Sequence, residues 1–408
     1  MRLWFSKINE IFLRRIKTAV ARQPRNLWPI LPTLLAATLF AAAATGQAAG
    51  QPSGRATQAM QLEQEGKLSE AAYAWREVVK EDARNASAWA SLAVVLSRLE
   101  QFPDAVAAYH KALALNPKLP GVELNLGLAE FKSNNFEAAI PPLRAALAAD
   151  PKNTQARTLL GLSYYGTGKF GDAAKYLSQV SAADPTNAEL HNVLAQSCLS
   201  AKNFDCAMKE YSWILQRTPD SAVSHMLLGE ALDGLGKTPE AITEFEAAVK
   251  VDPHAPNVNF GLGYLYWKLR RYEQAAPAFE NEIAVDPQNA QALAYLGDVE
   301  LKRENPDKAL ALLTRAIAIR EDIRIAQLDL GVLLTQQKKY PEALAALRRA
   351  EQLDPEQPEV HFRLGRLYQA MGDAASAQKE YARVKQLHQK VQDAVVDKMS
   401  GGKTQGEP

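Results

Sequence analysis

The sequence predicts an all-α fold made of consecutive helix pairs, and two observations carry this prediction. Dipeptides that end in proline recur every 34 residues, and the apolar residues between them follow helical spacing. Arg320-Glu321 keeps this spacing but replaces the dipeptide. The proline dipeptides are Asn116-Pro117, Asp150-Pro151, Asp184-Pro185, Thr218-Pro219, Asp252-Pro253, Asp286-Pro287 and Asp354-Pro355.

Each 34-residue unit is expected to contain two helices joined by a turn. In the unit that starts at residue 154, Leu160 and Tyr164 are four residues apart, as are Ala173 and Leu177, so each pair shares one helix face. Gly168 stands between the two stretches and favours a turn. The proline dipeptide then ends the second helix, because proline has no N–H to donate and disfavours helical geometry in the residue before it.

Small residues occupy two fixed positions of the unit. We expect them to let the two helices of a pair approach closely, whereas larger residues there would push the helices apart. The alanines are Ala71, Ala105, Ala139, Ala173, Ala207, Ala241, Ala275, Ala309, Ala343 and Ala377, and the glycines are Gly127, Gly161, Gly229, Gly263, Gly297, Gly331 and Gly365.

A 34-residue helix-turn-helix that carries Trp89, Leu92, Ala105, Tyr109 and Pro117 at these positions resembles the tetratricopeptide repeat (TPR). The resemblance implies a right-handed superhelical solenoid of about ten helix-turn-helix repeats, whose first helices line a concave groove that binds peptides or proteins. The array is expected over residues 52–391, followed by a capping helix extension over 388–399 and a disordered tail over 400–408. A coiled-coil dimer seam is the alternative reading of that extension. The units start at residues 52, 86, 120, 154, 188, 222, 256, 290, 324 and 358.

The N-terminus has the features of an export signal. Residues 1–48 hold seven basic residues and one acid, with an apolar segment at 27–44 and small residues after it. We expect a secretory signal peptide and an exported protein, periplasmic or secreted. An uncleaved anchor in the inner membrane through residues 27–44 is the alternative, and it would be the chain's only contact with a membrane.

Charge and motifs exclude two classes of function. The rest of the chain has 40 basic against 45 acidic residues, so it offers no basic surface for nucleic acid. No HExxH, GxSxG, Walker or GxGxxG motif stands in a supporting context. The sequence therefore predicts neither an enzyme nor a cofactor or metal site.

Three histidines and two cysteines are residue types that can bind metal ions or form a disulfide. His191, His225 and His361 share one repeat position, and we interpret them as packing residues because neighbours one repeat apart do not converge on a metal ion. Cys198 and Cys206 flank the turn of the fifth unit. A disulfide and two buried free thiols both remain open for this pair.

The resemblance also gives candidate groove residues. Phe260, Tyr264 and Trp267 share one helix face, and they either contact a ligand or pack against the next unit. The full set is Leu124, Leu128, Phe131, Leu162, Tyr165, Asn192, Gln196, Glu230, Asp233, Phe260, Tyr264, Trp267, Asp298, Asp329, Arg363 and Arg366.

Fold and N-terminus together predict a non-catalytic interaction scaffold of the cell envelope. Such a scaffold would serve the assembly of an envelope, secretion or polysaccharide-export complex. Its partner would be a protein or peptide with apolar anchors and basic residues, because acidic positions lie beside apolar ones in the groove set. A glycan-binding module that uses the groove aromatics is one alternative, and an accessory subunit of an enzyme on another chain is a second.

Overall fold

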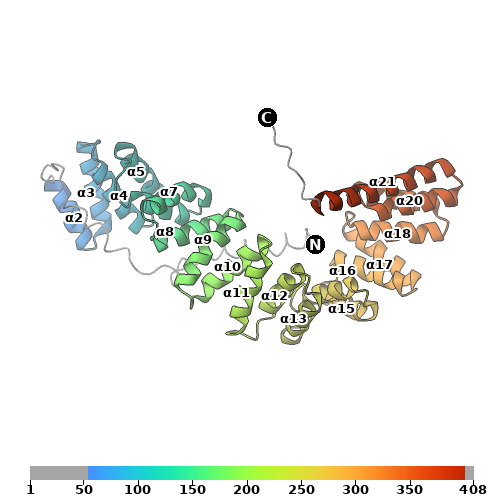
Figure 1. Cartoon of the computed structure of the whole chain (residues 1–408). Helices are drawn as coiled ribbons and strands as arrows, with labels where there is room; N and C mark the ends of the chain where they lie inside the picture. Colours follow the sequence, from blue (N-terminus) through green and yellow to red (C-terminus); the bar gives the residue numbers. More distant parts are fainter. Residues whose placement is uncertain (1–53, 400–408) are drawn as a thin grey trace. The chain divides into compact units, whose positions relative to one another are not determined.

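The computed structural model describes residues 54–399, and the signal at 1–48 and the tail at 400–408 lie outside the described residues. The described part is helical throughout, without a strand, and confirms the predicted all-α fold of tandem helix pairs (Figure 1). It forms two compact units that divide after Arg217.

The N-terminal unit contains five helix pairs. In each pair the first helix packs against the second, and within the unit the second helix of one pair packs against the first helix of the next pair. The helices are α2 (Gly54–Gln64), α3 (Leu68–Glu81), α4 (Ala86–Arg98), α5 (Phe102–Leu115), α6 (Val122–Lys132), α7 (Phe136–Ala149), α8 (Thr154–Gly166), α9 (Phe170–Ala183), α10 (Ala188–Ser200) and α11 (Phe204–Leu215).

The C-terminal unit repeats this arrangement with five further pairs. Its helices are α12 (Ala222–Gly234), α13 (Thr238–Val251), α14 (Val258–Lys268), α15 (Tyr272–Val285), α16 (Ala290–Lys302), α17 (Pro306–Ile319), α18 (Arg324–Gln336), α19 (Tyr340–Leu353), α20 (Pro358–Met371) and α21 (Ala374–Met399).

The turn inside each pair has the same backbone conformation. One residue in every turn has a positive φ, and these residues are 34 apart. Glycine tolerates this region without strain, yet it occupies only four of the ten positions. The ten residues are Gly66, Glu100, Asn134, Gly168, Lys202, Gly236, Arg270, Glu304, Lys338 and Gly372.

Close approach of the paired helices depends on the glycine column. A Cβ atom on Gly297 would lie 2.6 Å from Leu313 Cδ2, and one on Gly263 would lie 2.9 Å from Phe279 Cδ1. The alanine column is near, since the same Cβ on Gly297 would lie 3.6 Å from the Ala309 carbonyl oxygen. The tightest neighbour of each column glycine is therefore a large side chain 16 residues later rather than the expected alanine.

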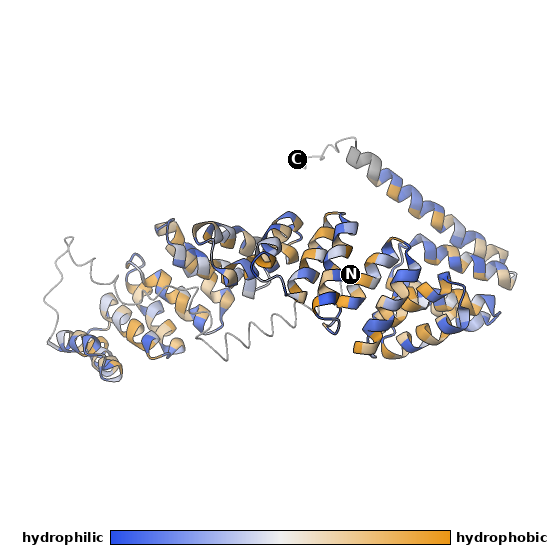
Figure 2. Ribbon diagram, turned by 90° about the horizontal axis from the view of Figure 1, so that it is seen from below, coloured by the Kyte–Doolittle hydropathy of each residue, from blue (hydrophilic) through white to orange (hydrophobic). Residues whose placement is uncertain are grey.

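The core runs through both units between the helices. Figure 2 shows hydrophobic residues interleaved with hydrophilic ones along each helix, as expected for amphipathic helices that pack on their neighbours. The column alanines from Ala71 to Ala343 are fully buried, and Tyr211, Phe245 and Phe279 are among the largest buried side chains.

Helix α21 is 26 residues long, and it continues without a break through the predicted capping extension. Leu387 on this helix is 3% exposed, whereas Val391 is 60% exposed. The apolar stripe is therefore covered as far as Leu387 and open one turn later.

Candidate functional site: the face of the first helices

Side chains on consecutive first helices meet along one diagonal, in which residue i contacts residue i+31. Tyr165 Oη donates to Gln196 Oε1 at 2.6 Å, and Trp267 Nε1 donates to Asp298 Oδ2 at 2.6 Å. The rings of Tyr264 and Tyr295 lie 5.5 Å apart on the same diagonal. We call the surface that carries these contacts the first-helix face.

In the N-terminal unit, some of the predicted groove residues are buried in the core and others are partly or fully exposed. Phe131 and Tyr165 are buried, with rings against Phe136 and Phe170 at 5.3 and 5.6 Å. Burial also raises the pKa of the Tyr165 hydroxyl. Leu124, Leu128, Leu162 and Gln196 are half-buried, and Asn192 is exposed.

In the C-terminal unit, the three predicted aromatics join a larger cluster. Phe260 is 6% exposed and packs on Phe279 at 5.8 Å. Tyr264 and Trp267 are half-buried and stack on each other at 5.6 Å. Tyr295 of α16 closes the cluster at 4.9 Å from Trp267. The packing alternative thus holds for Phe260, while Tyr264 and Trp267 both pack and reach the surface.

Tyr295 and Lys268 are members of this site that the sequence reasoning missed. Burial raises the pKa of Tyr295 to about 12, so its hydroxyl stays neutral at neutral pH. Lys268 Nζ donates to Asp233 Oδ1 at 2.6 Å, and Thr238 Oγ1 donates to the same atom at 2.8 Å. The repeat spacing could have found Tyr295, because it precedes the candidate Asp329 by 34 residues.

Acidic side chains continue the face beyond the aromatics. Glu230, Asp298 and Asp329 are all buried, and burial raises the pKa of Glu230 well above the ordinary range. Burial and the neighbouring Asp298 charge raise the pKa of Asp329 well above the ordinary range. Arg363 is half-buried on α20, and Arg366 is exposed.

The three column histidines act as structural clamps at repeat junctions. In each, Nε2 donates to the carbonyl oxygen of the proline six residues earlier, at 3.2 Å for His191, 3.0 Å for His225 and 2.9 Å for His361. Nδ1 of each faces a glutamate of the following helix, which is Glu210, Glu244 or Glu380. At the same repeat position, Trp89 Nε1 donates to the carbonyl oxygen of Ala83, also six residues earlier, at 3.1 Å. Side chains at this position therefore connect a first helix to the loop before it.

Around His361, potential metal ligands lie close together. Glu351, His361 and Glu380 place one ligand atom each within 4.8 Å of one another. Arg348 Nη1 already donates to Glu351 Oε2 at 2.6 Å and to Glu380 Oε1 at 3.1 Å. Because this guanidinium compensates both carboxylates, we interpret the cluster as an ion-pair network.

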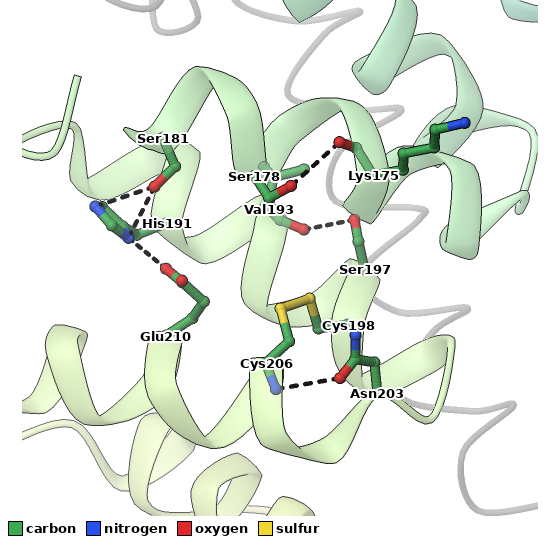
Figure 3. The surroundings of a disulfide bond; sticks show 10 residues. All are labelled: Lys175, Ser178, Ser181, His191, Val193, Ser197, Cys198, Asn203, Cys206 and Glu210. Atoms are coloured by element: carbon green, nitrogen blue, oxygen red, sulfur yellow. Dashed lines mark hydrogen bonds and ion pairs between the residues drawn. A yellow bond between two sulfur atoms is a disulfide. The ribbon is translucent and has the colours of Figure 1, made fainter. Parts of the chain in front are cut away.

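Cys198 and Cys206 form a disulfide between α10 and α11 (Figure 3). Their Cα atoms are 5.7 Å apart, within the usual range for such a bond. The backbone N–H of Cys206 also donates to Asn203 Oδ1 at 3.3 Å, which caps α11. The bond therefore closes the turn of the fifth helix pair.

Opening this disulfide should destabilise the N-terminal unit. The double change Cys198→Ala with Cys206→Ala is expected to lower the free energy of unfolding by about 2.5 kcal/mol, because a short closed loop restricts the unfolded chain. Urea unfolding with and without a reductant measures the effect. The parent should shift with reductant while the double variant does not, and a parent insensitive to reductant would contradict the prediction.

Family models for tetratricopeptide repeats match most of the chain. The model described as the cytochrome c-type biogenesis protein H TPR domain matches residues 51–183. Models described as tetratricopeptide or TPR repeats match residues 164–231, 226–284, 261–323, 331–372 and 359–390. None of the curated proteins compared with the chain matches it.

Solved structures with a similar arrangement share little sequence. YrrB, described as a TPR protein with an unusual peptide-binding site, is 21% identical; the match covers 46% of this chain and 97% of YrrB, with a TM-score of 0.37. Pseudomonas aeruginosa PilF is 23% identical, with coverage of 50% and 93% and a TM-score of 0.39. A chain of the Cut9–Hcn1 hetero-tetramer of the APC/C is 17% identical, with coverage of 74% and 59% and a TM-score of 0.45.

The helix pairs, the 34-residue columns and the family models agree over residues 54–323 and 331–390. The chain is a tetratricopeptide-repeat protein.

Proposed function

We propose that this chain is a non-catalytic scaffold of the cell envelope that binds a peptide or protein segment on its first-helix face. One observation carries the proposal. In the C-terminal unit, the half-buried rings of Tyr264 and Trp267 lie beside a row of acidic side chains on consecutive first helices. Partly exposed aromatics next to buried polar groups are typical of interface hot spots.

The acidic side chains of the face favour a partner with basic residues. Asp298 and Asp329 are adjacent acids on α16 and α18, and Asp298 also accepts the Trp267 indole N–H. A basic segment with apolar anchors would place its anchors near the rings and its charges near these acids. A glycan reader has less support, because Tyr264, Trp267 and Tyr295 face one another instead of presenting a row of free ring faces.

Two features support the envelope as the location. The N-terminal residues have the composition of an export signal, and the Cys198–Cys206 disulfide suits an oxidising compartment. Assembly of an envelope, secretion or polysaccharide-export complex remains the proposed role. Within residues 54–399, no helix has both the length and the apolar character that a membrane span requires.

Removing the half-buried rings of Tyr264 and Trp267 should abolish partner binding. The variant Trp267→Ala with Tyr264→Ala is expected to lose the proteins that the full chain captures from a native envelope fraction, because both anchors are gone. Quantitative mass spectrometry of the captured proteins measures the loss. Some stability should also be lost, since Trp267 packs on Tyr295 and bonds to Asp298.

The matched control is Tyr73→Ala, because Tyr73 is 66% exposed on α3, a second helix. This control should capture the same proteins as the parent. Trp267→Phe keeps an aromatic ring but removes the N–H donor. This milder change serves as a second test variant in case the double variant does not fold. Retained capture by a folded double variant would overturn the first-helix face as the binding surface.

A further inference from the structure

Among the described residues of the C-terminal unit, every fully buried carboxylate oxygen except two has a hydrogen-bond partner. Asp233 receives hydrogen bonds from Lys268 and Thr238. Glu282 accepts from the backbone N–H groups of Asn257 and Phe260, at 3.1 and 3.2 Å. Glu300 is bound by Arg303 at 3.0 Å, by Lys308 at 2.9 Å and by Asn305 at 2.8 Å. Such pairing is the rule for buried carboxylates, because an unpaired one is costly.

Asp329 is the exception on the aromatic side of the first-helix face. It is 6% exposed, and its Oδ2 atom has no hydrogen-bond partner among the described residues. The second exception is Glu230 Oε1 on α12. An acceptor buried without a donor indicates a place where a bound group could supply one.

The nearby cations do not satisfy Asp329. The charged groups that act on it are Asp298 and Lys302 of α16 and Arg363 of α20. Lys302 Nζ lies 3.7 Å from Asp298 Oδ1, and Arg363 Nη2 is held by Glu359 at 2.6 Å. Both cations are on partly exposed, flexible side chains, so a ligand can displace them from the approach to the acids.

Asp298 connects Asp329 to the aromatic cluster. Its Oδ2 atom accepts the Trp267 indole N–H, and its side chain also lies within hydrogen-bonding reach of Asp329. Tyr295 packs edge-on against Trp267 at 4.9 Å. Two neighbouring carboxyl groups and two aromatic rings thus lie together on α14, α16 and α18.

We propose that Asp298, Asp329, Trp267 and Tyr295 form a subsite that binds one arginine side chain of the partner segment. The inference rests on the proposed function and names the partner residue that this part of the first-helix face binds. A guanidinium is planar and weakly hydrated, it donates paired hydrogen bonds to carboxylates, and it stacks on aromatic rings. A lysine ammonium is a compact, strongly hydrated charge and fits this combination less well.

Binding at this subsite is coupled to release of a proton. Burial and the Asp298 charge hold the pKa of Asp329 well above its ordinary value, so the carboxyl group retains its proton more readily. The incoming guanidinium forms an ion pair with the carboxylate, and the displaced proton passes to solvent. The affinity for an arginine peptide should therefore fall as the pH is lowered.

The test uses the full chain and an array of random 12-residue peptides. Peptides that bind should be enriched in arginine, and replacing that arginine by citrulline should weaken binding at least about tenfold, because hydrogen bonds to charged groups are the strong ones. Replacement by lysine should weaken binding less. Affinities of the best binders are measured by fluorescence anisotropy from pH 5.5 to 8.

Asp329→Asn should remove the preference for arginine over citrulline and the pH dependence together. The matched control is Asp307→Asn, because Asp307 is an exposed acid in the first turn of α17. Equal binding of arginine and citrulline peptides, or equal losses in the two variants, would overturn the subsite and leave the proposed function standing. If no peptide binds the parent chain, both the subsite and the proposed peptide-binding function are wrong.

Discussion

Replacing Ala309 by leucine should lower the free energy of unfolding of the C-terminal unit by about 3 kcal/mol, near the upper end of what overpacking of a core costs. Ala309 has no exposed surface, and it lies on α17 near Gly297 of α16, where a Cβ atom on the glycine would be 3.6 Å from the Ala309 carbonyl oxygen. A leucine side chain there has no free volume to enter. Urea unfolding followed by circular dichroism measures the loss.

Ala311→Leu is the control for this prediction. Ala311 is on the same helix but exposed, so the same change of side chain should alter stability by no more than about 0.5 kcal/mol. Equal effects of the two substitutions would mean that the alanine column is not where the helices approach each other.

Asp329→Asn should make the protein increasingly more stable than the parent as the pH rises. The folded state holds the pKa of Asp329 above that of the unfolded chain, so below about pH 4 both states are protonated and the group has no effect. Above that pH the unfolded state loses its proton while the folded state keeps it. The parent then loses about 1.4 kcal/mol of unfolding free energy for each pH unit, until the folded pKa is reached.

Unfolding curves of parent and variant between pH 4 and pH 8 measure this difference. Asparagine cannot ionise, so the variant lacks the penalty. Asp307→Asn should show no such widening gap, because Asp307 is exposed. If the free energies of unfolding of Asp329→Asn and the parent differ by the same amount at every pH, Asp329 ionises as readily in the folded state as in the unfolded state.

The repeat fold could be read from the sequence because packing is periodic in sequence. A buried alanine at position 309 and a glycine at 297 recur every 34 residues, and the helices follow. The conformation of the turns could be predicted from the sequence only in part. Glycine at 168 signalled a turn, but Lys202 and Arg270 adopt the same positive φ without any signal in residue type, because the helices on either side impose it.

The first-helix face was predictable as a set of positions but not as a set of exposed side chains. The spacing of Phe260, Tyr264 and Trp267 predicts that they share one face, which is correct for a single helix. Whether each ring is open depends on the next first helix, which brings Tyr295 against all three. That contact depends on how adjacent pairs stack, and repeat columns within one sequence do not contain this information.

The diagonal between first helices bears on how such a chain can change by gene duplication. Core contacts depend on the 34-residue period, so copying or deleting one whole repeat would restore every helix to a matching neighbour. The face contacts join residues 31 apart in adjacent repeats, as in Trp267 with Asp298. An inserted repeat would separate such partners and create a new pair at each junction. Duplication would thus preserve stability but change the binding specificity. The unit that determines specificity would be the junction between two repeats.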